Sequence, residues 1–188
     1  RDQPTPSFFP YTTLFRSGGI SVGAHRKGRV VDVNQALDGE GPFSPERSGT
    51  LPAGALAKLC FSGKYPQDEV RKMITGRGGY VAYLGTNSAQ EVEERAAAGD
   101  GKAKLVRDAM VYQVAKEIGG MSTVLKGVVD AVLLTGGIAC SASFVADLTE
   151  RVRHIAPVFV YPGEDELRAL ASNGLRVLWG RAEALLYA

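Results

Sequence analysis

The segment DAVLLTGGIACS carries a pattern that could contact phosphate. Gly136 and Gly137 follow a run of apolar residues that is typical of a buried strand. Glycines at such a place let the backbone approach a ligand closely, and a helix that follows offers unpaired N–H groups to an anion. The same pair also suits a simple packing turn, so this pattern alone leaves both interpretations open.

A long loop forms the second candidate. Residues 38–52 read DGEGPFSPERSGTLP, which is long for a connection within a compact domain and therefore suggests a functional role. The loop carries Arg47, followed by Ser48 and Gly49. Taken alone, an arginine in such a loop is better explained by simple exposure to solvent.

The first half of the chain supplies elements that would position these residues. Ile20 to His25 and Arg29 to Val33 are rich in residues that favour strands, and the Lys27-Gly28 turn between them predicts a hairpin. Ser88, with Glu91 three residues later, predicts a helix that starts with a capping box and ends near Gly99. We also expect helices over residues 53–61 and 68–74, and a short strand or extended segment over 79–85.

The second half alternates helix and strand. From Ala103 to Leu125 apolar residues, Leu105 and Tyr112 among them, recur at helical spacing, so we expect a central, well-buried helix. A buried strand at 131–134, a helix entered near 141–143, a strand at 158–162 and a helical region over 164–187 follow. This order indicates an α/β fold.

Composition narrows the classes of function. The chain has 188 residues, 45% of them hydrophobic, and a formal net charge of +2 without runs of like charge, which argues against nucleic acid or an anionic membrane as a partner. A small molecule is the expected partner. Cys60 and Cys140 are far apart, so we expect two buried thiols in a reducing cytoplasm, and no zinc site. No apolar stretch approaches the roughly 20 residues that a membrane span needs.

The first 17 residues differ in pattern from the rest of the chain. They contain three prolines and an apolar Phe8-Phe9 pair without helical or strand period. Their core, FFPYTTLFRS, resembles one translated frame of a sequencing adaptor, so we expect residues 1–17 to be a non-native leader. The alternative is a natural disordered leader.

Three stretches resemble the butyrate kinase branch of the acetokinase family in order and spacing: GGISVGAHRKGRVVDVNQALDGEGPFSPERSGTLP, LTGGIACS and VYPGEDELRALA. The resemblance implies the second, C-terminal domain of the acetate kinase-like α/β fold, within the ribonuclease H-like and actin-like ATPases. Residues 18–188 would form this nucleotide-binding domain of a two-domain carboxylate kinase, with the first domain missing. GIACS stands where acetate kinases typically have a Gly-Glu-Asn-Ser ending, which favours the butyrate branch.

The resemblance also implies roles around the phosphates. Gly18 and Gly19 match the end of the family's phosphate motif, but its preceding histidine has no counterpart, and His25 is expected to be an ordinary surface or packing residue. Arg47 matches the arginine of an Arg-Ser-Gly signature that neutralises the group in transit. A guanidinium suits this task because it is planar, permanently charged and able to bind two phosphate oxygens at once.

Further matches concern adenosine and metal. Gly136, Gly137 and Ile138 match the adenosine motif, with Ile138 as an apolar contact for the base. Asp32 matches an aspartate that could hold magnesium, although a strand-end residue explains it nearly as well. Either Asp165 or Glu166 corresponds to an acid near the metal, and we select Glu166; a helix N-terminus would also place acids there.

For the intact parent the resemblance implies transfer of phosphate from ATP to butanoate, giving ADP and butanoyl phosphate, with Mg²⁺. Catalysis would consist mostly of positioning and charge neutralisation as two domains close. Because the first domain supplies the carboxylate pocket, we expect this chain alone to be inactive. The alternatives are a noncatalytic nucleotide-binding module or a kinase for branched short-chain acids. The parent is also expected to be a homo-oligomer.

Overall fold

A hairpin opens the described part of the chain. The computed structural model describes residues 18–163 and 166–184, and the side chains of 18–163 and 168–184. β1 (Gly23–Arg26) and β2 (Arg29–Val33) pair antiparallel, with a bulge between Ala24 and His25. Lys27 and Gly28 both have positive φ, as a two-residue hairpin turn requires. The hairpin prediction is confirmed, although β1 begins three residues later than expected.

The second sheet is a parallel pair. β3 (Val132–Gly136) pairs with β4 (Val158–Pro162), with Val132 opposite Val158 and Gly136 opposite Pro162. Between them lie a 3₁₀ turn, η2 (Gly137–Cys140), and α6 (Ala142–Val152), which Ser141 caps by accepting a hydrogen bond from the N–H of Phe144. The predicted strand, glycine turn and helix are therefore present, with a 3₁₀ turn added. Parallel strands end at one edge, where α/β proteins commonly bind ligands.

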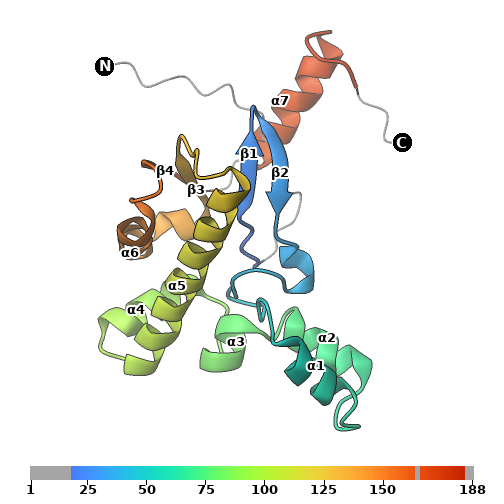
Figure 1. Ribbon diagram of the computed structural model, residues 1–188, viewed down its shortest axis with the longest axis vertical. Helices are drawn as coiled ribbons and strands as arrows, with labels where there is room; N and C mark the ends of the chain where they lie inside the picture. The colour runs from blue at the N-terminus through green and yellow to red at the C-terminus, as the bar shows by residue number, and fades with distance from the viewer. Residues whose placement is uncertain (1–17, 164–165, 185–188) are drawn as a thin grey trace.

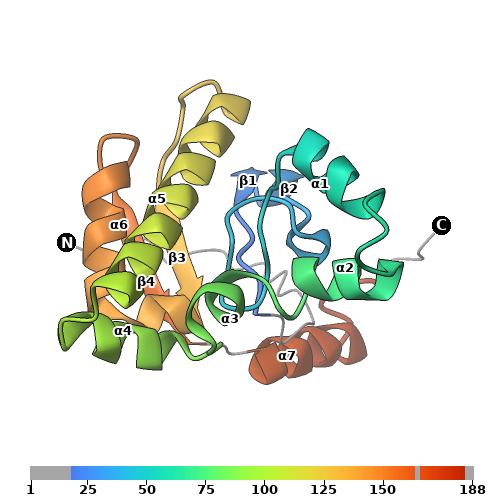
Figure 2. The same cartoon turned by 90° about the horizontal axis from the view of Figure 1, so that it is seen from below.

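α5 (Gly101–Val124) is the central helix of the fold. It lies beside α4 (Ala89–Ala97) and α6, and Figure 2 shows the hairpin on its other side. The core forms along α5 and continues into β3 and α6, and it includes Val106, Met110, Val114, Leu134 and Phe144.

Two residues expected in this core are exposed. Leu105 is 70% exposed and Tyr112 is 54% exposed, so their predicted burial is wrong. At 100° per residue, Leu105 lies about 200° around the helix from the buried Ala103, and Tyr112 follows Leu105 by two turns on the same outer face.

The remaining helices are α1 (Ala53–Cys60), α2 (Gln67–Ile74), α3 (Gly79–Leu84) and α7 (Glu166–Leu178), together with the short 3₁₀ turn η1 (Ala36–Asp38). In Figure 1 these helices lie at the two ends of the hairpin, with α1, α2 and α3 below it and α7 at its upper end. The strand or extended segment predicted at 79–85 is wrong, because these residues form α3. The aromatic and β-branched residues of GYVAYL favour a strand locally, but Gly85 ends a helical turn in the left-handed conformation.

The predicted burial of both cysteines is also wrong. Cys60 and Cys140 are free and exposed. Cys60 ends α1, which has no buried residue, and Cys140 ends η2. Within the described part of the chain, no helix is long and apolar enough to cross a membrane.

Candidate active site

Phe43 anchors the long loop of residues 38–52 in the core. Its side chain is 5% exposed and packs edge-on against the rings of Tyr80 and Tyr83 of α3, at centroid distances of 6.2 and 6.0 Å. Its N–H donates to Oε1 of Gln113 on α5, at 3.0 Å. Burial raises the pKa of Tyr80, and nearby Glu93 raises it further, so this ring stays neutral in its packed position. The loop is therefore attached to the central helix.

Backbone hydrogen bonds hold the segment that carries Arg47. The N–H of Ser48 donates to the carbonyl of Ile74 at 3.0 Å. The N–H groups of Gly76 and Gly78 both donate to the carbonyl of Glu46, at 2.8 and 3.0 Å. These bonds tie the loop to the end of α2 on both sides of Arg47.

Gly78 and Gly79 let the start of α3 lie against this segment. A Cβ at Gly79 would overlap the carbonyl oxygen of Ser44, and one at Gly78 would overlap the N–H of Ser48. Gly79 also has φ +53°, which L side chains rarely adopt. Our reading of the sequence missed this pair, although two adjacent glycines in GRGGY are a signal for close backbone approach.

The structure brings Arg47 together with the glycine pair of the hairpin segment. Nη1 of Arg47 donates to the carbonyl of Ala36 in η1. A Cβ built on Gly19 would lie 2.8 Å from Nη1 and 3.1 Å from Cζ of Arg47. A Cβ on Gly18 would lie 3.1 Å from Cγ and Oε2 of Glu46. The absence of side chains at Gly18 and Gly19 thus makes room for the loop residues that face them.

The three residues of the adenosine motif lie at the carboxyl edge of the parallel pair. Gly136 ends β3 with φ +79°, and its carbonyl accepts from the N–H of Gly163 at 3.2 Å. Among the described residues, a Cβ at Gly136 or Gly137 would meet nothing within 4 Å, so those residues leave space beside this backbone. Ile138 is half-buried and packs against the same core as Ile20. In the described parts of the chain, no hydrogen bond joins these three residues to the contact between Gly19 and Arg47.

The structure describes the side chain of only one of the two acids predicted near the metal. Asp32 lies in β2 opposite Ala24 and is exposed. Glu166 begins α7, close after β4, but its side chain lies outside the described residues, as does Asp165 entirely. Within residues 18–163 and 168–184, no group of three or more His, Cys, Asp or Glu could hold a metal. Magnesium usually takes one or two carboxylates plus phosphate oxygens and water, so both assignments stay predictions. His25 is exposed, as expected.

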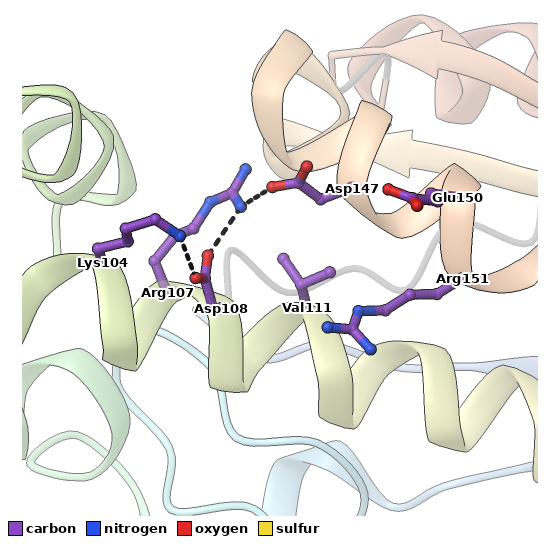
Figure 3. A pocket seen from close by; sticks show the side chains of 7 residues that line it. All are labelled: Lys104, Arg107, Asp108, Val111, Asp147, Glu150 and Arg151. Atoms are coloured by element: carbon purple, nitrogen blue, oxygen red, sulfur yellow. Dashed lines mark hydrogen bonds and ion pairs between the residues drawn. The ribbon is translucent and has the colours of Figure 1, made fainter.

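A groove of about 400 Å³ lies between α5 and α6, away from these residues (Figure 3). Arg107, whose side chain is 5% exposed, forms ion pairs there with Glu93 of α4 (3.1 Å), with Asp108 (3.1 Å) and with Asp147 of α6. Burial lowers the pKa of Arg107, but its bonds to these carboxylates outweigh that effect and keep the pKa above its usual value. The pairs join three helices, and the mixed charges give the groove no preference for an anion.

Comparison with known proteins identifies the family. The model of the acetokinase family matches residues 13–171. The chain belongs to the acetokinase family. It is 57% identical to butyrate kinase 2 of Clostridium acetobutylicum over 170 residues, which cover 90% of this chain and 48% of that protein. The chain thus spans about half the length of the curated relative it matches.

Solved structures of this family share the fold. Acetate kinase of Porphyromonas gingivalis matches with a TM-score of 0.77 at 20% identity, over 86% of this chain and 47% of that one. Acetate kinase of Entamoeba histolytica matches with a TM-score of 0.71 at 15% identity, over 85% of this chain and 49% of that one. These likenesses confirm the predicted acetate kinase-like α/β fold.

Proposed function

We propose that this acetokinase chain is the nucleotide-binding half of a short-chain carboxylate kinase of the butyrate kinase type. The intact protein would transfer phosphate from ATP to butanoate and release ADP and butanoyl phosphate. The contact between the Arg47 guanidinium and Gly19 carries the proposal, because it places a permanent positive charge beside backbone that has no side chain. The 57% identity to a protein named butyrate kinase 2 supports butanoate over other short acids.

The residues present fit the phosphates of a nucleotide. Gly18 and Gly19 leave bare backbone beside the loop, and Arg47 offers donors in a planar fork that suits phosphate oxygens. Bound ATP would supply the phosphoryl group, and Mg²⁺ would neutralise part of its charge. Arg47 would stabilise the charge that spreads over the transferring oxygens, and the attachment of its loop to α2 and α5 would keep the guanidinium in place without reorganisation.

The adenosine end would lie at the edge of the parallel strands. The described residues leave space beside Gly136 and Gly137 there, and Ile138 offers an apolar side chain to the base. Asp32 and Glu166 would hold the metal, directly or through water.

We also propose that residues 18–188 are one C-terminal domain of this kinase and that residues 1–17, which lie outside the described residues, are a leader foreign to it. In this proposal the acid is held by the other half of the intact protein, which works as a cytoplasmic homo-oligomer. Closure of the two halves would exclude water from the transfer.

A hybrid protein tests the proposed reaction. Residues 18–188 are joined to the part of Clostridium acetobutylicum butyrate kinase 2 that this chain does not cover. With ATP, Mg²⁺ and butanoate, we expect acyl phosphate, trapped as a hydroxamate, in an amount that depends on the hybrid. The same assay with isobutanoate in place of butanoate tests the alternative that the enzyme acts on branched acids. A folded hybrid that binds ATP but forms no acyl phosphate from either acid would favour the noncatalytic module.

A further inference from the structure

Asn34 is a buried amide at the junction of two segments of the site. It follows β2, is 5% exposed, and uses its acceptor and both of its donors. Oδ1 accepts from the N–H of Val22 at 2.6 Å. Nδ2 donates to the carbonyl of Ile20 at 3.3 Å and to the carbonyl of Glu40 at 2.9 Å.

One side of this amide holds the segment that follows the glycine pair. Ile20 comes directly after Gly19, and Val22 comes two residues later. The backbone N–H of Asn34 also points to the carbonyl of Val22, at 3.4 Å. Asn34 thus fixes the segment that directly follows Gly18 and Gly19 in the chain.

The other side of the amide holds the loop of Arg47. Gly41, with φ +84°, packs so closely on the amide that a Cβ there would overlap Nδ2 of Asn34. The N–H of Gly41 donates to Oγ1 of Thr50 at 2.8 Å, and the N–H of Thr50 donates to the carbonyl of Gly41 at 2.9 Å. Thr50 lies three residues after Arg47, so Asn34 is connected to the loop of Arg47 through Gly41 and Thr50.

We propose that Asn34 is a positioning residue that fixes the spacing between the Gly18-Gly19 backbone and the Arg47 loop, so that both contact the same phosphate group. The inference rests on the proposed function. An amide is needed because one side of the site presents an N–H and a carbonyl while the other presents a carbonyl. An aspartate of the same shape would keep the acceptor, lose both donors and set a carboxylate against the carbonyl oxygens of Ile20 and Glu40.

The test compares Asn34→Asp with the unchanged 188-residue chain. Hydrogen exchange should quicken in residues 20–22 and 40–50 together and stay unchanged in α5, β3 and β4. By titration calorimetry with Mg²⁺, the affinities for ADP and pyrophosphate should fall about tenfold, while the affinity for adenosine stays the same. Thr50→Val removes the hydroxyl that accepts from Gly41, the residue packed against the Asn34 amide. It should quicken exchange in both segments and lower ADP affinity by a smaller factor, and it serves if Asn34→Asp does not fold.

Val152→Ala is the matched control, since Val152 is fully buried in α6 away from the site. It should lower the melting temperature without changing the ratio of pyrophosphate to adenosine affinity. Faster exchange in only one of the two segments, or an equal loss of adenosine and pyrophosphate binding, overturns the positioning role alone. If the unchanged chain binds neither ADP nor ATP at millimolar concentration, the proposed function fails, and the positioning role fails with it.

Discussion

The guanidinium of Arg47 occupies the space into which a side chain of residue 19 would project. A Cβ on Gly19 would lie 2.8 Å from Nη1 and 3.1 Å from Cζ, and the carbonyl of Ala36 accepts from Nη1. The arginine is therefore held between a glycine and a backbone acceptor. Residue 19 can change the position of the charge without taking part in any chemistry itself.

Gly19→Ala should move the arginine while leaving the fold intact. The added methyl meets the end of a flexible side chain rather than backbone, so we expect little change in melting temperature. In the hybrid kinase described above, turnover should fall at least about tenfold, which corresponds to about 1.4 kcal/mol of lost transition-state stabilisation. Steady-state hydroxamate kinetics measure this.

Gly54→Ala is the control for this change. Gly54 lies in α1, and a Cβ there would meet none of the described residues within 4 Å. It should leave turnover unchanged and stabilise the helix slightly. If Gly19→Ala turns over like Gly54→Ala, the contact with Arg47 has no catalytic consequence.

The 188-residue chain alone should form no acyl phosphate above background. In our proposal the acid is bound by the other half of the intact protein, so phosphate has no positioned acceptor here. The hydroxamate assay with butanoate, ATP and Mg²⁺ checks this, with the hybrid as the positive control. Product that grows with the amount of the chain would show that it carries an acid site of its own.

Local patterns in the sequence were sufficient for elements whose own residues determine them. The Lys27-Gly28 turn, the Ser88 cap and the run from Val158 to Pro162 all lie where they were predicted. The capping box is half formed, because the carboxylate of Glu91 accepts from Thr86 rather than from the N–H of Ser88.

Predictions failed where distant contacts decide. α3 is a helix although its residues favour a strand, since Gly79 packs directly on Ser44 of a loop far back in the chain. The family resemblance located Gly19 and Arg47, but only the folded chain shows that they touch. The sequence did not indicate the role of Asn34, because a sequence alone does not distinguish a buried asparagine from an exposed one.

Arg107→Ala should destabilise the fold strongly. The change removes the positive charge from beside Glu93, whose side chain is 21% exposed and still accepts from the Ser143 hydroxyl, and breaking a buried pair costs about 3–5 kcal/mol. Asp147 remains half exposed to water, which places the expected loss near the lower end of that range. Urea unfolding followed by circular dichroism measures the change in free energy of unfolding.

Arg151→Ala provides the comparison in the same groove (Figure 3). Arg151 lies over the ring of exposed Tyr112 at 5.7 Å, a contact worth about 0.5–1 kcal/mol at such a site. Similar losses for the two variants would mean that the buried ion pairs do not hold α4, α5 and α6 together.

Arg47→Ala, tested in the hybrid kinase, should reduce turnover far more than it weakens ATP binding. Arginines that act on a transferring phosphoryl group contribute on the order of a thousandfold or more to the rate, because they meet charge that develops only in the transition state. Arg47→Lys should restore only part of the rate, since lysine keeps the charge but lacks the planar fork. Ser48→Ala, next to it in the same loop, is the control: the Ser48 hydroxyl donates to the carbonyl of Gly49, and its loss should leave turnover within a few fold. Near-normal turnover of a folded Arg47→Ala hybrid would make the loop structural, and the catalytic assignment of Arg47 would then be wrong.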